Sequence, residues 1–412
     1  MTAAGRSPGT GWAVDVTAVL ASVGLAAVLS LAYSAAAGRL LGPDSYSDFA
    51  GALALATLLA VALGALTPIT AVLAARYVAA GQPARVRGLT RQLLRIALAG
   101  GVAVLLIAVV AGRPLAGFLQ FRSAGIVAAA VAVYVGIAAS SLVRAAIRGS
   151  QRFGDYSRNV IAESGVRLLA GVAILILTRS VVLAILAYAL GTLVATISGL
   201  RVVRRLSPEV EAVRFREVTS MLGATALLAA AMAVFQNVDM LLVKRYFEPA
   251  AAGIYGSAAA LARTMAVLLM PLEALLIPRL TYLLERREPA AASMGRLLAL
   301  FLAGVTLPLL LFAFAPRIIV TAIYGRAYGD AAPLLLPLGG AMILLVLAYL
   351  CGQVLISMGR ARLVSAFAAL VVVEVCLVIF IHDSLLTVAL ILVATRSAAL
   401  LVMVLGLRRG RR

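Results

Sequence analysis

This sequence of 412 residues is almost free of cysteine, histidine, lysine and tryptophan. Cys351 and Cys376 both lie within apolar stretches, so a disulfide framework is excluded. The single histidine, His382, lies in a short loop, and no spacing of ligand residues suggests a metal, so neither a metal nor another cofactor is expected. The sequence also lacks a glycine-rich phosphate loop and a polar segment long enough for a soluble enzyme core. We therefore expect a protein that is not an enzyme.

Charged residues are also scarce, at 13% of the chain, whereas hydrophobic residues make up 64% and mean hydropathy is +1.09. This composition excludes a soluble fold. Twelve apolar stretches follow one another, most of them long enough for a helix to cross a bilayer of about 30 Å. They span residues 13–37, 49–75, 92–112, 123–147, 159–178, 180–200, 217–243, 252–278, 297–315, 333–357, 361–381 and 384–407. The fold class predicted is an all-α membrane protein with about 12 transmembrane helices.

The basic residues favour one side of the predicted membrane. If the N-terminus is cytoplasmic, 25 of the 36 lysines and arginines fall on the inner side and 8 on the outer side. Because positive charge in short loops marks the cytoplasmic side, both termini are predicted to be cytoplasmic in a multi-pass protein of the inner membrane. These charges lie next to helix ends, where anionic lipids are the expected partners and nucleic acid is not.

Short sequence matches indicate an internal duplication. Arg39-Leu-Leu-Gly-Pro43 resembles Arg245-Tyr-Phe-Glu-Pro249, and the segment from Pro68 to Arg76 corresponds to that from Pro271 to Arg279. A third pair joins Ile147-Arg-Gly149 to Ser357-Met-Gly359. Each half holds an even number of stretches, so both halves have the same orientation. We expect a six-helix bundle at 1–205, a cytoplasmic linker at 206–216 and a second six-helix bundle at 217–412, pseudo-symmetric around a central cavity.

The linker contains a helix-start pattern. In Ser207-Pro208-Glu209 the serine can cap, the proline suits the first helical position and the glutamate suits the first turn. The sequence leaves open whether this segment is a helix on the membrane surface or a solvated linker.

Several segments together resemble the polysaccharide or O-antigen flippases of the multidrug/oligosaccharidyl-lipid/polysaccharide exporter superfamily. The resemblance covers nearly the whole chain. The segments that carry it are Gly38-Arg-Leu-Leu-Gly-Pro-Asp-Ser-Tyr46 with Phe49, Arg148-Gly-Ser-Gln-Arg-Phe153, Asn237-Val-Asp239, Gly253-Ile-Tyr255, Ala315-Pro316, Tyr324-Gly325, Tyr328, and Ala331-Ala332-Pro333-Leu334.

The resemblance implies a transporter that moves a polyprenyl-pyrophosphate-linked oligosaccharide from the inner to the outer leaflet by alternating access. A hydrated cavity would replace the water lost by the pyrophosphate and the sugar hydroxyls, each of which costs several kcal/mol to bury unpaired. Partners implied are the polyprenyl-linked glycan and, for polymer synthesis, glycosyltransferases and a polysaccharide polymerase.

Charged residues within the stretches are the candidate site residues, because they are costly there. Arg263 and Arg396 lie near mid-depth and Arg167 lies nearer the inner side. We expect Arg263 and Arg396 to line the cavity and to bind pyrophosphate or acidic sugars with paired hydrogen bonds, with Arg167 as a further candidate.

Structural pairing is the alternative for two of these arginines. Glu163 and Arg167 lie four residues apart on one helix face, and Glu374 and Arg396 lie at similar depths on consecutive stretches. In such pairs the two side chains would only neutralise each other's charge. Arg263 has no partner on its own stretch, so it is the strongest substrate-binding candidate.

The acids define candidates for coupling transport to protons or sodium. They are Glu163, Asp239, Glu273 and Glu374. Asp239 lies near the outer end of its stretch, where solvation or helix capping is the competing interpretation. Tyr46, Tyr246, Tyr324 and Tyr328 are predicted to lie at the outer interface, in an aromatic belt.

Three function classes remain. The favoured class is the oligosaccharide-lipid flippase. A drug or metabolite exporter of the same superfamily is the second class, and a membrane glycosyltransferase or polymerase is the third. The outer loops are short and carry few acids, which disfavours the enzyme.

Overall fold

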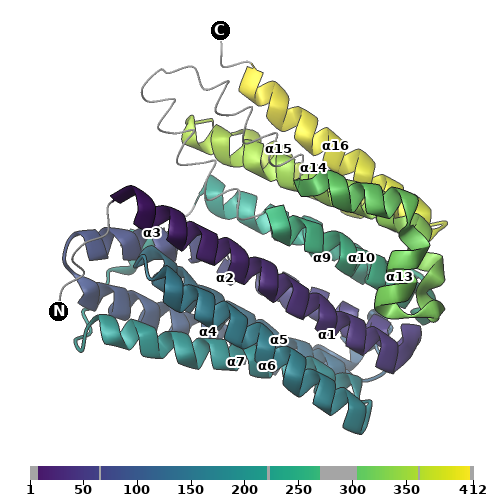
Figure 1. The fold of residues 1–412 in the computed structure, drawn as a ribbon, viewed down its shortest axis with the longest axis horizontal. Helices are drawn as coiled ribbons and strands as arrows, with labels where there is room; N and C mark the ends of the chain where they lie inside the picture. Colours follow the sequence, from purple (N-terminus) through teal and green to yellow (C-terminus); the bar gives the residue numbers. More distant parts are fainter. Residues whose placement is uncertain (1–7, 65, 220–222, 270–303, 361, 409–412) are drawn as a thin grey trace.

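The computed structural model describes residues 8–64, 66–219, 223–269, 304–360 and 362–408, in which the regular elements are helices (Figure 1). The N-terminal half contains α1 Pro8–Leu59, α2 Val61–Gly64, α3 Leu66–Ala79, α4 Pro83–Phe118, α5 Ala124–Gly149, α6 Phe153–Thr178 and α7 Val181–Leu206. A short helix, α8 Phe215–Thr219, follows. The C-terminal half contains α9 Ala224–Tyr246, α10 Pro249–Leu269, the helix Gly304–Phe314, α13 Pro316–Tyr324, the 3₁₀ helix η1 Arg326–Ala331, α14 Ala332–Ser357, α15 Leu363–Phe380 and α16 Leu385–Arg408.

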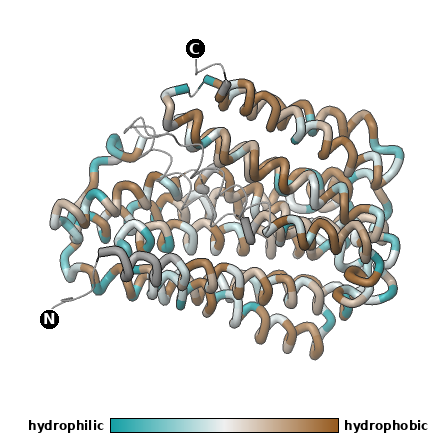
Figure 2. The backbone as a smooth tube through the Cα atoms, turned by 45° about the horizontal axis from the view of Figure 1, so that its top comes forward, coloured by the Kyte–Doolittle hydropathy of each residue, from teal (hydrophilic) through white to brown (hydrophobic). Residues whose placement is uncertain are grey.

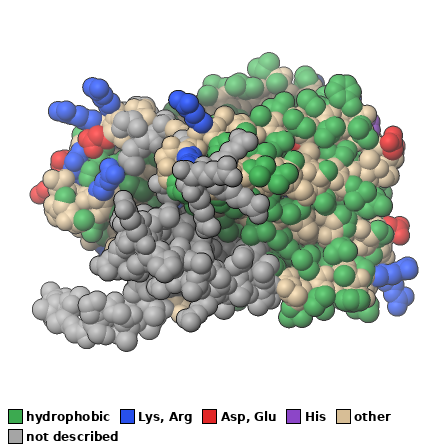
Figure 3. All heavy atoms as spheres, turned by 90° about the horizontal axis from the view of Figure 1, so that it is seen from above, with side chains coloured by type: hydrophobic (Ala, Val, Ile, Leu, Met, Phe, Trp, Pro, Cys, Tyr) green, Lys and Arg blue, Asp and Glu red, His purple; other side chains and the backbone are tan. Residues whose placement is uncertain are grey.

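The helices are those of a membrane protein. Within the described residues, nine helices are long and apolar enough to cross a bilayer, or ten if one bent pair counts as a span. Each of the twelve predicted stretches overlaps a helix. Apolar residues cover the middle of the tube and of the surface, whereas charged residues gather at the two ends (Figures 2 and 3). Side chains as apolar as Val110 and Leu177 are each 82% exposed, which is suited to lipid contact.

The first two predicted stretches meet within α1. The chain turns at Gly42, whose φ of 74° and ψ of 168° lie outside helical values. Glycine adopts a positive φ without steric cost, and the following Pro43 fixes a helical φ for the next segment. α1 therefore consists of two helical segments, 8–41 and 43–59, that change direction at this glycine.

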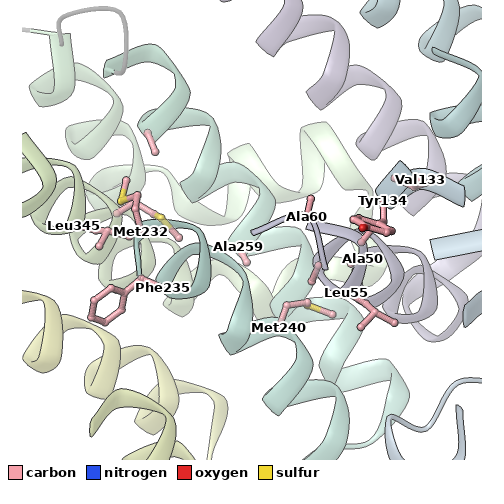
Figure 4. Packing of buried hydrophobic residues seen from close by; sticks show 14 of the residues in the cluster. Ala50, Leu55, Ala60, Val133, Tyr134, Met232, Phe235, Met240, Ala259 and Leu345 are labelled. Atoms are coloured by element: carbon pink, nitrogen blue, oxygen red, sulfur yellow. The ribbon is translucent and has the colours of Figure 1, made fainter. Parts of the chain in front are cut away.

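α1 lies at the centre of the molecule and packs against both halves. In Figure 1 it runs between the teal helices α4 to α7 and the green and yellow helices α14 to α16. It packs against α5 and α6 on one side and against α9 and α10 on the other. Small side chains allow this close approach: Ala50 and Leu55 of α1 lie beside Met240 of α9 (Figure 4). Contact between the halves therefore runs mainly through α1.

The linker differs from the surface helix that Ser207-Pro208-Glu209 suggested. Residues 207–214 are not helical, and the chain becomes helical again only at Phe215. The segment follows α4 instead: the Glu211 amide donates to the Ala84 carbonyl at 3.2 Å, and Arg87 donates to the Ser207 carbonyl at 3.1 Å. The alternative of a helix fails because these contacts with α4 hold the backbone extended.

A sharp bend precedes α14. The helix Gly304–Phe314 and α13 meet at an angle of 93° at Ala315, and Pro316 begins the new helix. α13 and η1 then pack against α1. The bend thereby carries Tyr324 and Tyr328 inward, onto the helix that joins the two halves.

Candidate functional site

A cavity of about 500 Å³ lies between the two halves. Its walls come mainly from α1 and α6 of the N-terminal half and from α10 of the C-terminal half, with single residues from α5 and α7. Among the described residues, the charged side chains that line it are Arg144, Glu163, Arg167 and Arg263. These residues contribute three guanidinium groups and one carboxylate, a formal charge of +2, which is favourable for an anionic ligand.

The N-terminal wall is organised around Glu163 of α6. Arg167, one turn further along α6, donates to Glu163 Oε1, and Arg144 of α5 donates to Glu163 Oε2. Arg144 also donates to Asn159 Oδ1 at 2.8 Å, and Arg167 donates to Ser30 Oγ at 3.2 Å. The predicted Glu163–Arg167 pair is present, and Arg167 lies on the cavity wall at the same time. One carboxylate shared by two arginines leaves the wall net positive.

Arg144 was not among the predicted site residues. It lies near the end of the predicted stretch 123–147. Its guanidinium reaches the cavity because α6 turns back tightly after α5, which brings Asn159 and Glu163 beside it. The carboxylate of Glu163 within an apolar stretch was the one sequence feature that could have indicated a basic partner on another helix. The sequence did not identify that partner as Arg144.

Arg263 of α10 forms the opposite wall. Its Nε donates to the Gln236 carbonyl of α9 at 2.8 Å, and its Nη2 lies 3.5 Å from Asp239 Oδ1. The structure thus places an acidic partner of Arg263 on α9. The solvated position expected for Asp239 is wrong: this residue is 1% exposed and accepts a hydrogen bond from Tyr255 Oη at 2.7 Å.

Arg396 does not line the cavity. It is fully buried within the C-terminal half, where its Nη2 lies 3.3 Å from Glu374 Oε1 and donates to the Phe235 carbonyl at 2.5 Å. Thr395 donates to the same carboxylate at 2.5 Å. The pairing alternative describes this arginine. The cavity-lining expectation for Arg396 is wrong because contacts with α9, α14 and α15 bury it.

Two other predictions concern the coupling candidate Glu273 and metal binding. Glu273 lies outside the described residues. No cluster of three or more metal-ligating side chains occurs among the residues that the structure describes.

A group of tyrosines closes one end of the cavity. Ser34, which lines the cavity, lies 2.7 Å from Tyr46 Oη and 2.9 Å from Tyr324 Oη. Tyr328 Oη donates to the Gly38 carbonyl at 2.8 Å. The aromatic-belt expectation for Tyr46, Tyr324 and Tyr328 is wrong, since each is 1% exposed. We call Ser34, Tyr46, Tyr324 and Tyr328 the tyrosine partition.

An ion pair joins the halves beside the tyrosine partition. Lys244 Nζ of α9 lies 2.7 Å from Asp48 Oδ1 of α1, and both side chains are 1% exposed. Lys244 also donates to Ser47 Oγ at 3.1 Å. Both residues lie just outside the predicted apolar stretches, one of which begins at 49 and another of which ends at 243, although α9 continues to Tyr246. The single lysine of the chain is therefore a buried interhelical partner.

Comparisons with known proteins find one matching family model and several solved structures with a similar fold. A family model described as polysaccharide biosynthesis protein matches residues 85–333. A multidrug resistance MATE family transporter of the MOP superfamily, solved in an inward-facing conformation, is 15% identical, with a TM-score of 0.70 over 95% of this chain and 97% of that chain.

Two further structures match less closely. An outward-facing MATE transporter is 17% identical, with a TM-score of 0.62 over 96% of this chain and 95% of the other. A MOP superfamily transporter from Pyrococcus furiosus, described as having a binding pocket of reverse polarity, is 15% identical, with a TM-score of 0.58 over 96% and 94%. These likenesses show the fold. No curated protein matches the sequence.

Proposed function

Because this chain belongs to the polysaccharide biosynthesis protein family, whose model it matches over more than half its length, we propose that it is a flippase for lipid-linked oligosaccharides. Its substrate is a polyprenyl-pyrophosphate glycan that loads from the inner leaflet of the cytoplasmic membrane and leaves to the outer leaflet. Glycosyltransferases supply this substrate and a polysaccharide polymerase consumes it. The single observation that carries the proposal is the arginine-lined cavity between the halves.

The cavity supports an anionic head group in particular. Arg167 and Arg263 face it from opposite walls, so a diphosphate or an acidic sugar between them would receive paired hydrogen bonds from two guanidinium groups. Tyr156 and Tyr188 add aromatic surface to the same lining. The polyprenyl tail remains in the bilayer, so only the polar head requires the cavity. No covalent bond changes, which is consistent with a transporter that has no catalytic group.

The two ends of the cavity differ, which supports a mechanism of alternating access. The tyrosine partition and the Asp48–Lys244 pair close one end of the cavity, whereas its lining extends toward Arg144 and Tyr156 at the opposite end. That opposite end carries Arg148, Arg152 and Arg158, which the excess of positive charge assigns to the cytoplasm. In the proposed cycle this conformation receives substrate from the inner leaflet.

A drug or metabolite exporter is the second candidate, favoured by the fold shared with MATE transporters. The net positive lining opposes cationic drugs, so an exporter with this cavity would carry anions. Proton or sodium coupling belongs to both candidates. Among the predicted acids, Asp239 and Glu163 contact the arginines of the cavity directly.

The test measures lipid-linked oligosaccharide in each leaflet after depletion of this protein, with variants supplied in its place. Wild type and Arg113→Ala, which changes an exposed arginine of α4, restore outer-leaflet glycan. Arg263→Ala and Arg167→Ala leave it in the inner leaflet at equal protein abundance. An unchanged leaflet distribution on depletion, with a redundant flippase excluded, refutes the flippase and leaves the anion exporter.

A further inference from the structure

Two buried polar atoms face each other across the edge of the cavity without a hydrogen bond. They are Arg263 Nη2 and Asp239 Oδ1, 3.5 Å apart, and both lack a hydrogen-bond partner within the described residues. Buried charged groups are ordinarily satisfied by hydrogen bonds, so a contact of this kind needs an explanation. The neighbouring Arg396–Glu374 pair is closer, at 3.3 Å, and is hydrogen-bonded.

The two ends of this contact have different environments. The Asp239 side chain is fully buried on α9, whereas the Arg263 side chain is 25% exposed and lines the cavity. Arg263 is held firmly at Nε, which donates to the Gln236 carbonyl at 2.8 Å. The guanidinium of Arg263 therefore lies between a buried carboxylate and the cavity.

We propose that Arg263 exchanges between Asp239 and the anionic head of the substrate, and that Asp239 takes up a proton when Arg263 leaves it. The part that names the anion as the competitor rests on the proposed function. The proton comes from water in the cavity and joins Asp239 Oδ1, the oxygen without a donor; no other bond forms or breaks. When the substrate leaves, Arg263 returns and the proton is released.

Among the residues that the structure describes, the neighbours of Asp239 provide no other charge that replaces Arg263. Tyr255 of α10 already donates to Oδ2. Arg396 of α16 is held by Glu374 of α15 and by the Phe235 carbonyl. On the side of α1, Asp48 is paired with Lys244. A carboxylate left in this position without Arg263 is an isolated buried charge, and such a group is neutralised rather than kept ionised.

The exchange makes proton uptake a consequence of binding. Arg263 is the positioning residue for this step, because it acts on Asp239 from the cavity side and needs no conformational change of the helices. Substrate binding and protonation of Asp239 then strengthen each other by the same factor, since linkage between two binding equilibria is reciprocal.

The first test removes Arg263 and leaves the substrate out. Infrared difference spectra between neutral and alkaline pH report the carbonyl stretch of protonated carboxyl groups in the purified protein. Arg263→Ala gains one protonated carboxyl at neutral pH that wild type and the matched arginine variant Arg113→Ala lack. The signal disappears in Arg263→Ala/Asp239→Asn, which assigns it to Asp239. Arg263→Lys keeps the positive charge and should also lack the signal of a protonated carboxyl group. This variant provides a second measurement if the alanine variant does not fold. Absence of the signal in a folded Arg263→Ala protein overturns the proposal.

The second test uses a sulfated disaccharide, whose charge does not change near neutral pH, in weakly buffered solution with a pH indicator. Wild type takes up close to one proton for each ligand bound, and its affinity rises as pH falls. Asp239→Asn binds more tightly, with no uptake and no pH dependence. Equal uptake by Asp239→Asn overturns the exchange. Failure of wild type to bind, together with a positive infrared result, leaves the protonation of Asp239 in the absence of Arg263 standing and refutes the anion as the competitor that the proposed function supplies.

Discussion

The buried Asp48–Lys244 pair gives a quantitative prediction about what holds the two halves together. Both side chains are 1% exposed and the two charged atoms are 2.7 Å apart. In Lys244→Met the volume is nearly kept, but Asp48 retains only Arg122, whose Nε is 3.6 Å away and whose side chain is 55% exposed. Removing one partner of a buried pair costs about 3–5 kcal/mol, because the other charge stays buried and unpaired. The unfolding equilibrium should therefore shift by about 10²- to 10⁴-fold.

The double variant Asp48→Asn/Lys244→Met separates the charge effect from packing. With both charges removed, the free energy of unfolding should return to within about 1 kcal/mol of wild type, so that the pair shows a coupling energy of at least about 2 kcal/mol. Reversible unfolding in mixed detergent micelles measures all four proteins of the cycle. The Arg152–Asp155 pair provides a matched control, since its atoms are also 2.7 Å apart but its side chains are 40% and 20% exposed. Its coupling energy should stay below about 1 kcal/mol. Equal coupling energies for the two pairs would refute the argument from burial.

Two further predictions concern the contact between the halves and the linker. A Cβ at Gly253 would lie 1.9 Å from the Pro43 carbonyl oxygen, so Gly253→Ala should destabilise the protein by about 1–3 kcal/mol. The control is Gly340→Ala on α14, where a Cβ would meet open space. This variant should be neutral or stabilising in the same unfolding assay. The pKa of Glu217 lies below its ordinary value because Tyr77 Oη donates to it and Arg85 lies beside it. Its stabilising contribution is therefore present above the ordinary carboxyl pKa and lost as pH falls through the lowered one, so hydrogen exchange in 207–219 should increase only under strongly acidic conditions. Tyr77→Phe should move this increase to higher pH, and an unmoved profile would contradict the assignment.

The helices could be predicted from the sequence because each apolar run is a local property. A helix that crosses the bilayer needs apolar side chains along its length, and each of the twelve stretches overlaps a helix. The Glu163–Arg167 pair could also be predicted from the sequence, since a spacing of four residues places two side chains on one helix face.

Contacts between distant helices could not be predicted in this way. Asp239 looked solvated and Lys244 looked like a loop residue because hydropathy falls toward the end of α9, yet the helix continues to Tyr246 and other helices cover it. Tyr324 looked like an interfacial aromatic residue because the 93° bend before α13 leaves no distinctive sequence signal beyond Pro316. The polarity of these residues was visible, but their partners depend on tertiary packing.

The closed end of the cavity has a consequence for how the membrane potential acts on the protein. The tyrosine partition is formed by neutral hydroxyl groups, and the adjoining Asp48–Lys244 pair has no net charge. An electric field does work of about 2.3 kcal/mol for each elementary charge moved through 100 mV, and the groups of this closed end together carry no net charge. The described lining of the cavity does carry net charge, and the anionic occupant of the proposed function would offset it. We therefore expect the membrane potential to act differently on the loaded and empty forms of the cavity, and less strongly on its closed end.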